Sequence, residues 1–266
     1  MVSRTASLTT AYGASLEYLT VGTGAPVTLF VHGLAGGIPD TRPLGSAVEG
    51  TKVFVHQRGH GGSTATPGRW GYAELARDVA AVADEVGATR ALGVSLGAGA
   101  LCRLLVDDPD RFERLVFFLP AVLDTPRAGP SRDRMVALAR AAATGDAELA
   151  GRIIGAEVPT DFRDTPPART FVAQRVGALL GPGLGDSLTA LPDDVPLPAG
   201  VGALGAVTAP ALVLGCEGDP AHPAEMTRAL AAALPHARAH VYPEPGVLWT
   251  HRADLRGRIS TFLNAS

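Results

Sequence analysis

The sequence has little of the residues that mark several classes of protein. Its two cysteines, Cys102 and Cys216, allow at most one disulfide, and neither lies in a CxxC or Cys/His cluster of zinc-binding spacing. Lysine occurs once, at Lys52, and the 23 basic residues are balanced by 26 acidic ones. Because no block of like charge stands out, no nucleic-acid partner is expected. No bound metal or cofactor is expected either.

Long hydrophobic runs are also missing. The longest, Leu115–Leu123, has nine residues, whereas a membrane-spanning helix needs about 20. The segment Met1–Thr10 is polar and lacks the apolar stretch of a signal peptide. We therefore expect a cytoplasmic protein that does not bind membranes. Its expected partner is a small-molecule substrate, and it is expected to be a monomer or homodimer.

What is present is enough apolar material for a large core. Of the 266 residues, 46% are hydrophobic and 18% are charged, which excludes disorder as the main state. Short β-branched and apolar runs alternate with longer segments of helical spacing, as in a mostly parallel sheet covered on both faces. The predicted strands are Ser7–Thr10 and Leu16–Val21 as a hairpin, then Val27–Val31, Lys52–His56, Arg90–Val94, Leu115–Leu119, Ala211–Gly215 and Ala239–Tyr242.

Strand signals stop between Asp124 and Thr208. This stretch is rich in alanine and arginine, and proline and glycine divide it into predicted helices at Arg132–Thr144, Ala147–Ile154 and Ala168–Leu180. It is interpreted as a helical insertion in one α/β domain, with a separate helical domain as the alternative.

The strongest local signal is the run Gly93-Val94-Ser95-Leu96-Gly97. It leaves a predicted strand and opens an apolar segment of helical character. A serine on such a sharp turn needs small neighbours, and its hydroxyl then stands free at the start of a helix. The pattern indicates a nucleophilic serine, and the alternative is a glycine-rich turn with an incidental serine.

Here the chain resembles the α/β-hydrolase family. Phe30–Leu34 resembles its strand ending in His-Gly, Arg58–Ser63 its RGHGxS turn, Asp108–Phe112 the entry to its next strand, and Leu212–Pro223 the strand and loop that deliver the acid. The resemblance implies a doubly wound, mostly parallel sheet as a core of residues 1–123 and 209–266. Residues 124–208 would then form a helical cap over the active site.

The family order of serine, acid and histidine implies a triad of Ser95, Asp219 and His251. Asp124 and Glu217 are rivals for the acid. His251 departs from the pattern, because the family's Gly-His after the last strand is missing and five residues separate it from Gly246.

The other histidines are expected to be structural. His240 lies in a strand pattern, His222 and His236 read as loop or surface positions, and His32 and His60 belong to turns. A second departure is Gln57, where the family commonly has an aspartate, so either the hydrogen bonds under the RGHG turn or the pocket wall would differ.

The implied chemistry is acyl transfer. Ser95 would attack, His251 would act as base and then acid, Asp219 would orient it, and the backbone N–H groups of Leu34 and Leu96 would form the oxyanion hole. The alternatives are a lyase, cyclase or acyl transferase of the same fold, or a binding protein that lost the histidine.

The substrate is expected to be uncharged and largely apolar. The insertion repeats apolar residues at helical spacing, and the bases Arg132, Arg134 and Arg140 are interpreted as solvated rather than as an anion clamp. A carboxylic ester, lactone or thioester fits. The apolar residues are Met135, Val136, Leu138, Phe171, Val172, Val176, Leu179 and Leu180.

Overall fold

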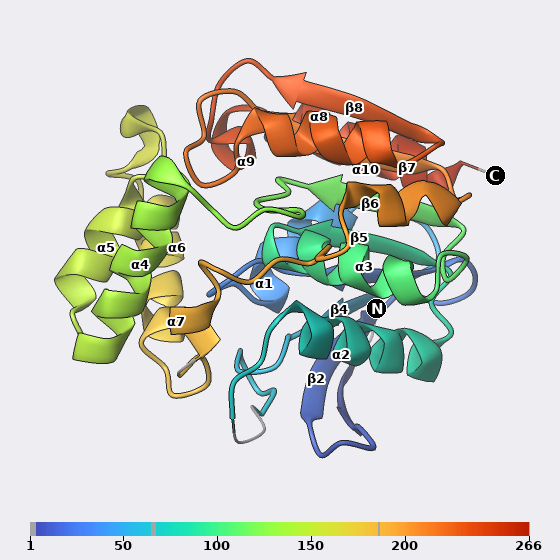
Figure 1. The fold of residues 1–266 in the computed structure, drawn as a ribbon, viewed down its shortest axis with the longest axis horizontal. Coiled ribbons are helices and arrows are strands. Elements are labelled where there is room, and N and C mark those ends of the chain that lie inside the picture. The colour runs from blue at the N-terminus through green and yellow to red at the C-terminus, as the bar shows by residue number, and fades with distance from the viewer. Residues whose placement is uncertain (1–3, 65–67, 186, 266) are drawn as a thin grey trace.

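The computed structural model describes residues 4–64, 68–185 and 187–265, which form one eight-stranded sheet with helices on both faces (Figure 1). The strands are β1 (Arg4–Thr9), β2 (Ser15–Val21), β3 (Val27–Val31), β4 (Thr51–Val55), β5 (Arg90–Val94), β6 (Arg114–Phe118), β7 (Ala211–Cys216) and β8 (Ala237–Tyr242). The α-helices are α1 (Ile38–Thr41), α2 (Tyr72–Val86), α3 (Leu96–Asp107), α4 (Gly129–Thr144), α5 (Ala147–Gly155), α6 (Pro166–Leu179), α7 (Ser187–Ala190), α8 (Ala224–Ala233), α9 (Val247–Thr250) and α10 (Arg252–Asn264). Short 3-10 helices are η1 (Arg42–Gly45), η2 (Thr160–Phe162) and η3 (Val201–Ala206).

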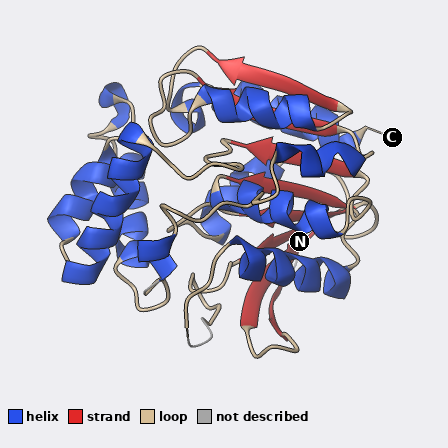
Figure 2. Cartoon of the chain, viewed as in Figure 1, coloured by secondary structure: helices blue, strands red, loops and turns tan. Residues whose placement is uncertain are grey.

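The strand order is β1-β2-β4-β3-β5-β6-β7-β8. The pairs β1–β2 and β2–β4 are antiparallel, and every later pair is parallel. Figure 2 shows helices packed on either side of the strands. The predicted α/β architecture is confirmed, including the leading hairpin, and each predicted strand falls on an observed one.

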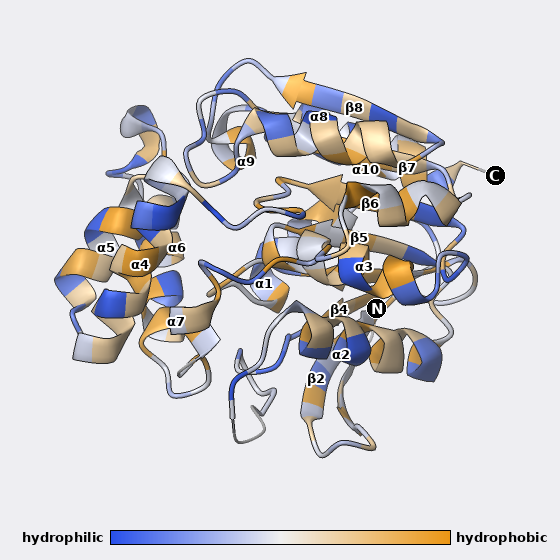
Figure 3. Ribbon diagram, in the orientation of Figure 1, coloured by the Kyte–Doolittle hydropathy of each residue, from blue (hydrophilic) through white to orange (hydrophobic). Residues whose placement is uncertain are grey.

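Two apolar layers hold the helices to the sheet. On one face, side chains such as Leu29 pack with α2, α3 and α8, and on the other Phe30 packs with α10 and the η1 region. Alternate residues of a strand point to opposite faces, so a continuous apolar run such as Val27–Val31 serves both layers. Figure 3 shows the contrasting pattern on the edge strand β8, where hydrophilic and hydrophobic residues alternate.

Parallel pairing brings the carboxyl ends of the strands to one edge of the sheet. Val31 of β3 pairs with Gly93 of β5, and Val94 pairs with Phe118 of β6. Phe118 in turn pairs with Leu214 of β7. The loops that follow β3, β5 and β7 therefore meet at this edge, where open α/β sheets bind their ligands.

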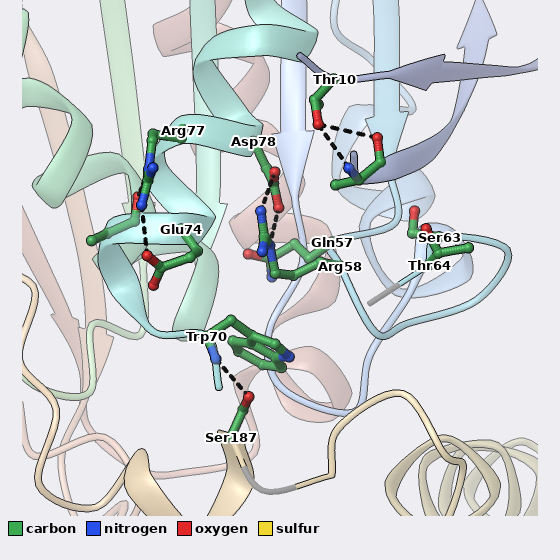
Figure 4. Close-up of polar contacts among 12 residues, drawn as sticks. Thr10, Gln57, Arg58, Ser63, Thr64, Trp70, Glu74, Arg77, Asp78 and Ser187 are labelled. Carbon is green, nitrogen blue, oxygen red and sulfur yellow. Dashed lines mark hydrogen bonds and ion pairs between the residues drawn. The ribbon is translucent and has the colours of Figure 1, made fainter. Parts of the chain in front are cut away.

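Helices α4 to α7 form a separate group beside the sheet, at the left of Figure 1. Between β6 and β7, the described residues contain helices, turns and bends but no strand. The group is tied to the core by the backbone N–H of Trp70, which donates to Ser187 Oγ at 2.8 Å (Figure 4), and by the N–H of Tyr72, which donates to Asp194 at 2.9 Å. The helices predicted at Arg132–Thr144, Ala147–Ile154 and Ala168–Leu180 fall on α4, α5 and α6.

A buried ion pair lies beneath the turn that follows β4. Arg58 Nε donates to Asp78 Oδ2 at 2.5 Å, and Nη2 donates to Oδ1 at 2.7 Å (Figure 4). The two side chains are 2% and 4% exposed. Burial raises the pKa of Asp78, against the opposing effect of the guanidinium. The pair fixes the Arg58 turn to helix α2.

No helix among the described residues is long and apolar enough to cross a membrane. Cys102 and Cys216 are both buried and free, as expected from their isolated positions in the sequence.

Candidate active site

Ser95 stands on the sharp turn between β5 and α3. Its φ and ψ of 50° and −105° are strained for a residue with a side chain. The strain is held by the flanking elements: the Ser95 N–H donates to Phe118 O at 2.9 Å, and Gly99 N–H donates to Ser95 O at 3.1 Å. The predicted strand–turn–helix around the serine is therefore present.

The glycines of this turn are needed for close packing. A Cβ on Gly97 would lie 2.4 Å from the backbone oxygen of Val31, and a Cβ on Gly93 would lie 2.5 Å from the oxygen of Gly97. Both distances are shorter than real contacts allow. Because α3 starts directly against β3, only glycine fits at these two positions.

The side chain that meets Ser95 is His222. Its Nε2 lies 3.0 Å from Ser95 Oγ, and its Nδ1 lies 2.9 Å from Asp219 Oδ2. A carboxylate can only accept, so Nδ1 carries the proton and Nε2 is free to accept from the serine hydroxyl. His222 and Asp219 are 16% and 18% exposed. The three side chains form a continuous chain of hydrogen bonds with the polarity of a proton relay.

Asp219 is held in its ionised form. Burial alone would raise its pKa, but the charge of a protonated His222 and the hydrogen bonds from His222 and Ala221 outweigh this and lower the pKa of Asp219 to about 2. The Ala221 N–H donates to Asp219 Oδ1 at 2.8 Å. The carboxylate is therefore charged and oriented at neutral pH.

The prediction that His251 joins Ser95 is wrong in this structure. His251 Nδ1 lies 2.8 Å from Thr250 Oγ1, and its ring lies 5.0 Å from that of Tyr242. The reason is that the segment after β8 forms the short helix α9, which directs Trp249 against Phe162 and Phe171 of the insertion. This segment therefore contacts the insertion, and a different histidine contacts Ser95.

The rival carboxylates lie elsewhere. Asp124 is exposed and accepts from the backbone N–H of Val201 at 3.2 Å, while Glu217 forms an ion pair with Arg228. Of the acids considered, the structure brings Asp219 to the histidine that contacts Ser95.

The loop after β3 presents a backbone donor beside the serine. Leu34 and Leu96 both line the cavity that contains Ser95. Within the described part of the chain, neither N–H has a hydrogen-bond partner, as expected for Leu96 at the first position of α3. The next residue, Ala35, has φ 53°, and its N–H donates to His60 Nε2 at 3.1 Å. The role of these two N–H groups as an oxyanion hole stays a prediction.

Two buried histidines shape that loop. His32 Nδ1 lies 2.7 Å from Gly33 O, and its Nε2 accepts from the N–H of Gln57 at 3.0 Å. Burial lowers the pKa of His32 well below its usual range and lowers that of His60 to about 4, so both rings are neutral acceptors at neutral pH.

Gln57 replaces the usual aspartate beneath this loop. Its side-chain amide donates to His32 O at 2.5 Å, and the residue is 2% exposed. Of the two outcomes left open by the sequence, the substitution therefore alters the hydrogen bonds under the turn, and Gln57 is not among the residues that line the cavity.

The cavity beside Ser95 measures about 110 Å³ and lies between the sheet edge and the insertion. Of the apolar residues expected to line it, Met135, Leu138 and Leu179 do so, whereas Val136 is 48% exposed. The expectation that Arg134 is solvated is wrong, because Arg134 lines the cavity and pairs with Glu157. Its position on α4 faces the core rather than the solvent.

His222 is the functional candidate that the sequence interpretation missed. The available signal is local: Asp219 and His222 stand three residues apart in the loop that follows a parallel strand, at the edge where ligands bind. Among the described residues, no group of three or more His, Cys, Asp and Glu side chains is arranged to hold a metal ion.

Comparisons with known proteins identify the family of the fold. A family model described as the alpha/beta hydrolase fold matches residues 26–246, and the chain belongs to that family. A hydrolase from Pseudomonas aeruginosa is 25% identical with a TM-score of 0.80, over 98% of both chains.

Two further solved structures share the fold. An esterase from Exiguobacterium antarcticum has 18% identity and a TM-score of 0.81, over 97% of this chain and 99% of the other. An enol-lactonase from Burkholderia xenovorans has 21% identity and a TM-score of 0.81, over 98% and 100%. At these identities the two likenesses show the fold alone, and it is the family match that supports hydrolase activity in general.

One curated relative matches only in part. The dihydrolipoyllysine-residue acetyltransferase component of the acetoin cleaving system of Cupriavidus necator is 34% identical over 105 residues. The match covers 37% of this chain and 28% of that protein, so the chain spans well under two thirds of its length.

Proposed function

We propose that the protein is a serine hydrolase that cleaves a carboxylic ester, lactone or thioester of a largely apolar small molecule through an acyl-enzyme. The observation that carries the proposal is the chain of contacts from Ser95 Oγ to His222 Nε2 at 3.0 Å and from His222 Nδ1 to Asp219 at 2.9 Å. A serine hydroxyl is a weak nucleophile unless a base takes its proton, and this arrangement supplies that base.

In the first half of the reaction, Ser95 Oγ bonds to the carbonyl carbon of the substrate while its proton passes to His222 Nε2. The carbonyl oxygen becomes an oxyanion, which the N–H groups of Leu34 and Leu96 stabilise. When the intermediate collapses, the bond to the leaving oxygen or sulfur breaks, and that atom takes the proton from His222.

In the second half, water attacks the acyl-enzyme. His222 takes a proton from the water, the new oxygen–carbon bond forms, and collapse of the second intermediate returns the proton to Ser95 Oγ. Asp219 keeps its charge and stabilises the imidazolium in both halves. The cap role of residues 124–208 belongs to this proposal, because residues of α4 and α6 cover the side of the cavity that faces away from the sheet.

The acyl group is proposed to be short. The cavity of about 110 Å³ lies below the range of about 300–1,000 Å³ typical of sites for drug-sized ligands. Apolar side chains of the insertion form much of its wall, as expected for an acyl site.

The test is covalent labelling combined with turnover. A fluorophosphonate probe should label the wild-type protein at Ser95, and p-nitrophenyl butyrate should be hydrolysed with release of free butyrate. Ser95→Ala should remove labelling and reduce kcat by at least about 10³-fold, with an unchanged circular dichroism spectrum. Labelling at another residue, or equal turnover by the folded variant, would refute the proposal.

A further inference from the structure

Arg175 is a half-buried cation, and most of its donors make no hydrogen bond. It lies on α6, lines the cavity with Ser95, and its side chain is 15% exposed. Its guanidinium has five N–H donors. In the described chain, one of them makes a hydrogen bond, from Nη1 to Leu34 O at 3.3 Å, and the buried Nε has no partner. Buried donors are normally paired. The Nε of Arg175 therefore lacks the acceptor that is expected for a buried donor.

The neighbouring carboxylates do not fill that need. Asp40 Oδ2 and Glu157 Oε2 each lie 3.9 Å from the guanidinium, beyond hydrogen-bond distance. Asp40 Oδ2 already accepts from the N–H of Gly37 at 2.8 Å, and Glu157 Oε1 accepts from Arg134. Both acids form ion pairs with Arg175, but each already accepts a hydrogen bond from another donor, and neither is close enough to accept one from Arg175.

The charges that line the cavity favour an anion. Three arginines line it, Arg127, Arg134 and Arg175, with Glu157 as the one acid among the lining residues, while Asp40 pairs with Arg175 from outside the cavity. A second unpaired donor, the hydroxyl of Ser131 on α4, lines the same cavity and is buried without a partner among the described residues.

Arg175 is also held in place rather than free to turn to solvent. Its guanidinium lies 4.7 Å from the ring centroid of Phe171, one turn earlier on α6. Its bond to Leu34 O fixes it beside the residue whose N–H is proposed for the oxyanion hole. An acid bound here would sit close to the reacting carbonyl.

We propose that Arg175 is a specificity-determining residue that binds a carboxylate carried by the substrate. The preferred substrate is then an ester or lactone with an apolar body and a carboxylate about three or four carbons from the reacting carbonyl. This distance is about the length of one backbone residue, which separates the N–H of Leu34 from the Leu34 O that contacts Arg175. A planar guanidinium fork matches a carboxylate with two donors. This inference rests on the proposed function, and it replaces the expectation of an uncharged substrate.

The experiment compares two esters of one length. p-Nitrophenyl hydrogen glutarate is anionic, and its methyl ester is neutral. After the rate with Ser95→Ala is subtracted to remove spontaneous hydrolysis, the wild-type kcat/KM should favour the anion by about 10- to 100-fold. Arg175→Met should bring this ratio towards one, mainly by raising KM for the anionic ester. Arg169→Met, an exposed position on the same helix, should leave the ratio unchanged.

Two results would overturn the inference. One is a wild-type ratio of one or less. The other is a fall of both esters by the same factor in Arg175→Met, which would mean that Arg175 only supports the Leu34 loop.

A binding measurement covers the case in which Arg175→Met does not fold. By calorimetry on Ser95→Ala, glutarate should bind at least about tenfold more tightly than glutaramide, and equal binding would refute the inference. If wild type hydrolyses neither ester above Ser95→Ala, the proposed function fails, while the glutarate comparison still decides the role of Arg175.

Discussion

Asp219 and His222 belong to one short loop, three residues apart, and their side chains meet with Oδ2 and Nδ1 2.9 Å apart. The proposed base and its orienting acid therefore move together. Gly218, with φ 70°, opens the loop and Pro223 closes it at the start of α8. The loop that carries the pair joins β7 to α8, so both side chains come from one connection of the sheet.

Substitution of each of the two candidate histidines in turn should separate their roles. His222→Gln should reduce kcat for p-nitrophenyl butyrate by at least about 10³-fold, because it removes the proton acceptor of Ser95. His251→Gln is the matched control and should retain activity within about threefold, since its ring packs against Tyr242. Steady-state kinetics on both folded variants measures this, and a comparable loss in His251→Gln would contradict the assignment.

Stability should fall in mild acid because of His60. Its pKa is lowered by burial to about 4 in the folded state, against about 6.5 when unfolded. Between these values the unfolded chain binds a proton that the folded chain does not, so stability is full above pH 6.5 and is lost as the pH falls towards 4. The difference corresponds to about 3 kcal/mol.

Urea unfolding at a series of pH values measures this loss. His60→Gln keeps an acceptor for the Ala35 N–H but cannot titrate, so its stability should depend less steeply on pH over the same interval. Identical slopes in the two proteins would show that other groups cause the loss.

Breaking the buried ion pair at one end should be costly. Arg58→Met leaves Asp78 charged and buried without its partner, which should lower the free energy of unfolding by about 3–5 kcal/mol. In the double variant with Asp78→Asn the charge is gone, and part of the loss should be recovered. Urea denaturation of the single and double variants gives both values; an unaffected Arg58→Met protein would contradict the account.

The serine turn should not tolerate a methyl group at its second glycine. Gly97→Ala places a Cβ 2.4 Å from Val31 O and should destabilise the protein by about 1–3 kcal/mol or more. Gly177→Ala on α6 is the control: an added Cβ there has no atom within 4 Å, so stability should rise by up to about 1 kcal/mol. Thermal unfolding of both variants tests the contrast, which would be disproved by equal shifts.

Much of the fold could be predicted from the sequence because the signals are local. Apolar runs such as Val27–Val31 end at glycine or histidine, and the predicted helix Arg132–Thr144 lies within α4 and ends at the same residue. Ser95 follows from its flanking glycines, since the steric demand of the turn is written in neighbouring residues.

Two contacts of the site join distant segments of the chain, although the three-residue spacing of Asp219 and His222 is itself a local signal. His222 lies 127 residues from Ser95, and Arg175 lies 141 from Leu34, so each contact depends on how distant loops pack. The family order favoured a late histidine, but that order ranks positions along the chain and does not say which ring reaches the serine. The partners of Arg134 depend in the same way on the packing of α4 against α5.

Trp249 contacts Phe162 and Phe171, so the segment after β8 has a packing role and not a catalytic one. The segment after β8 therefore packs against the helices beside the cavity and not against Ser95. Under the proposed cap role, chimeras that exchange this segment together with those helices should keep Ser95, His222 and Asp219 in place.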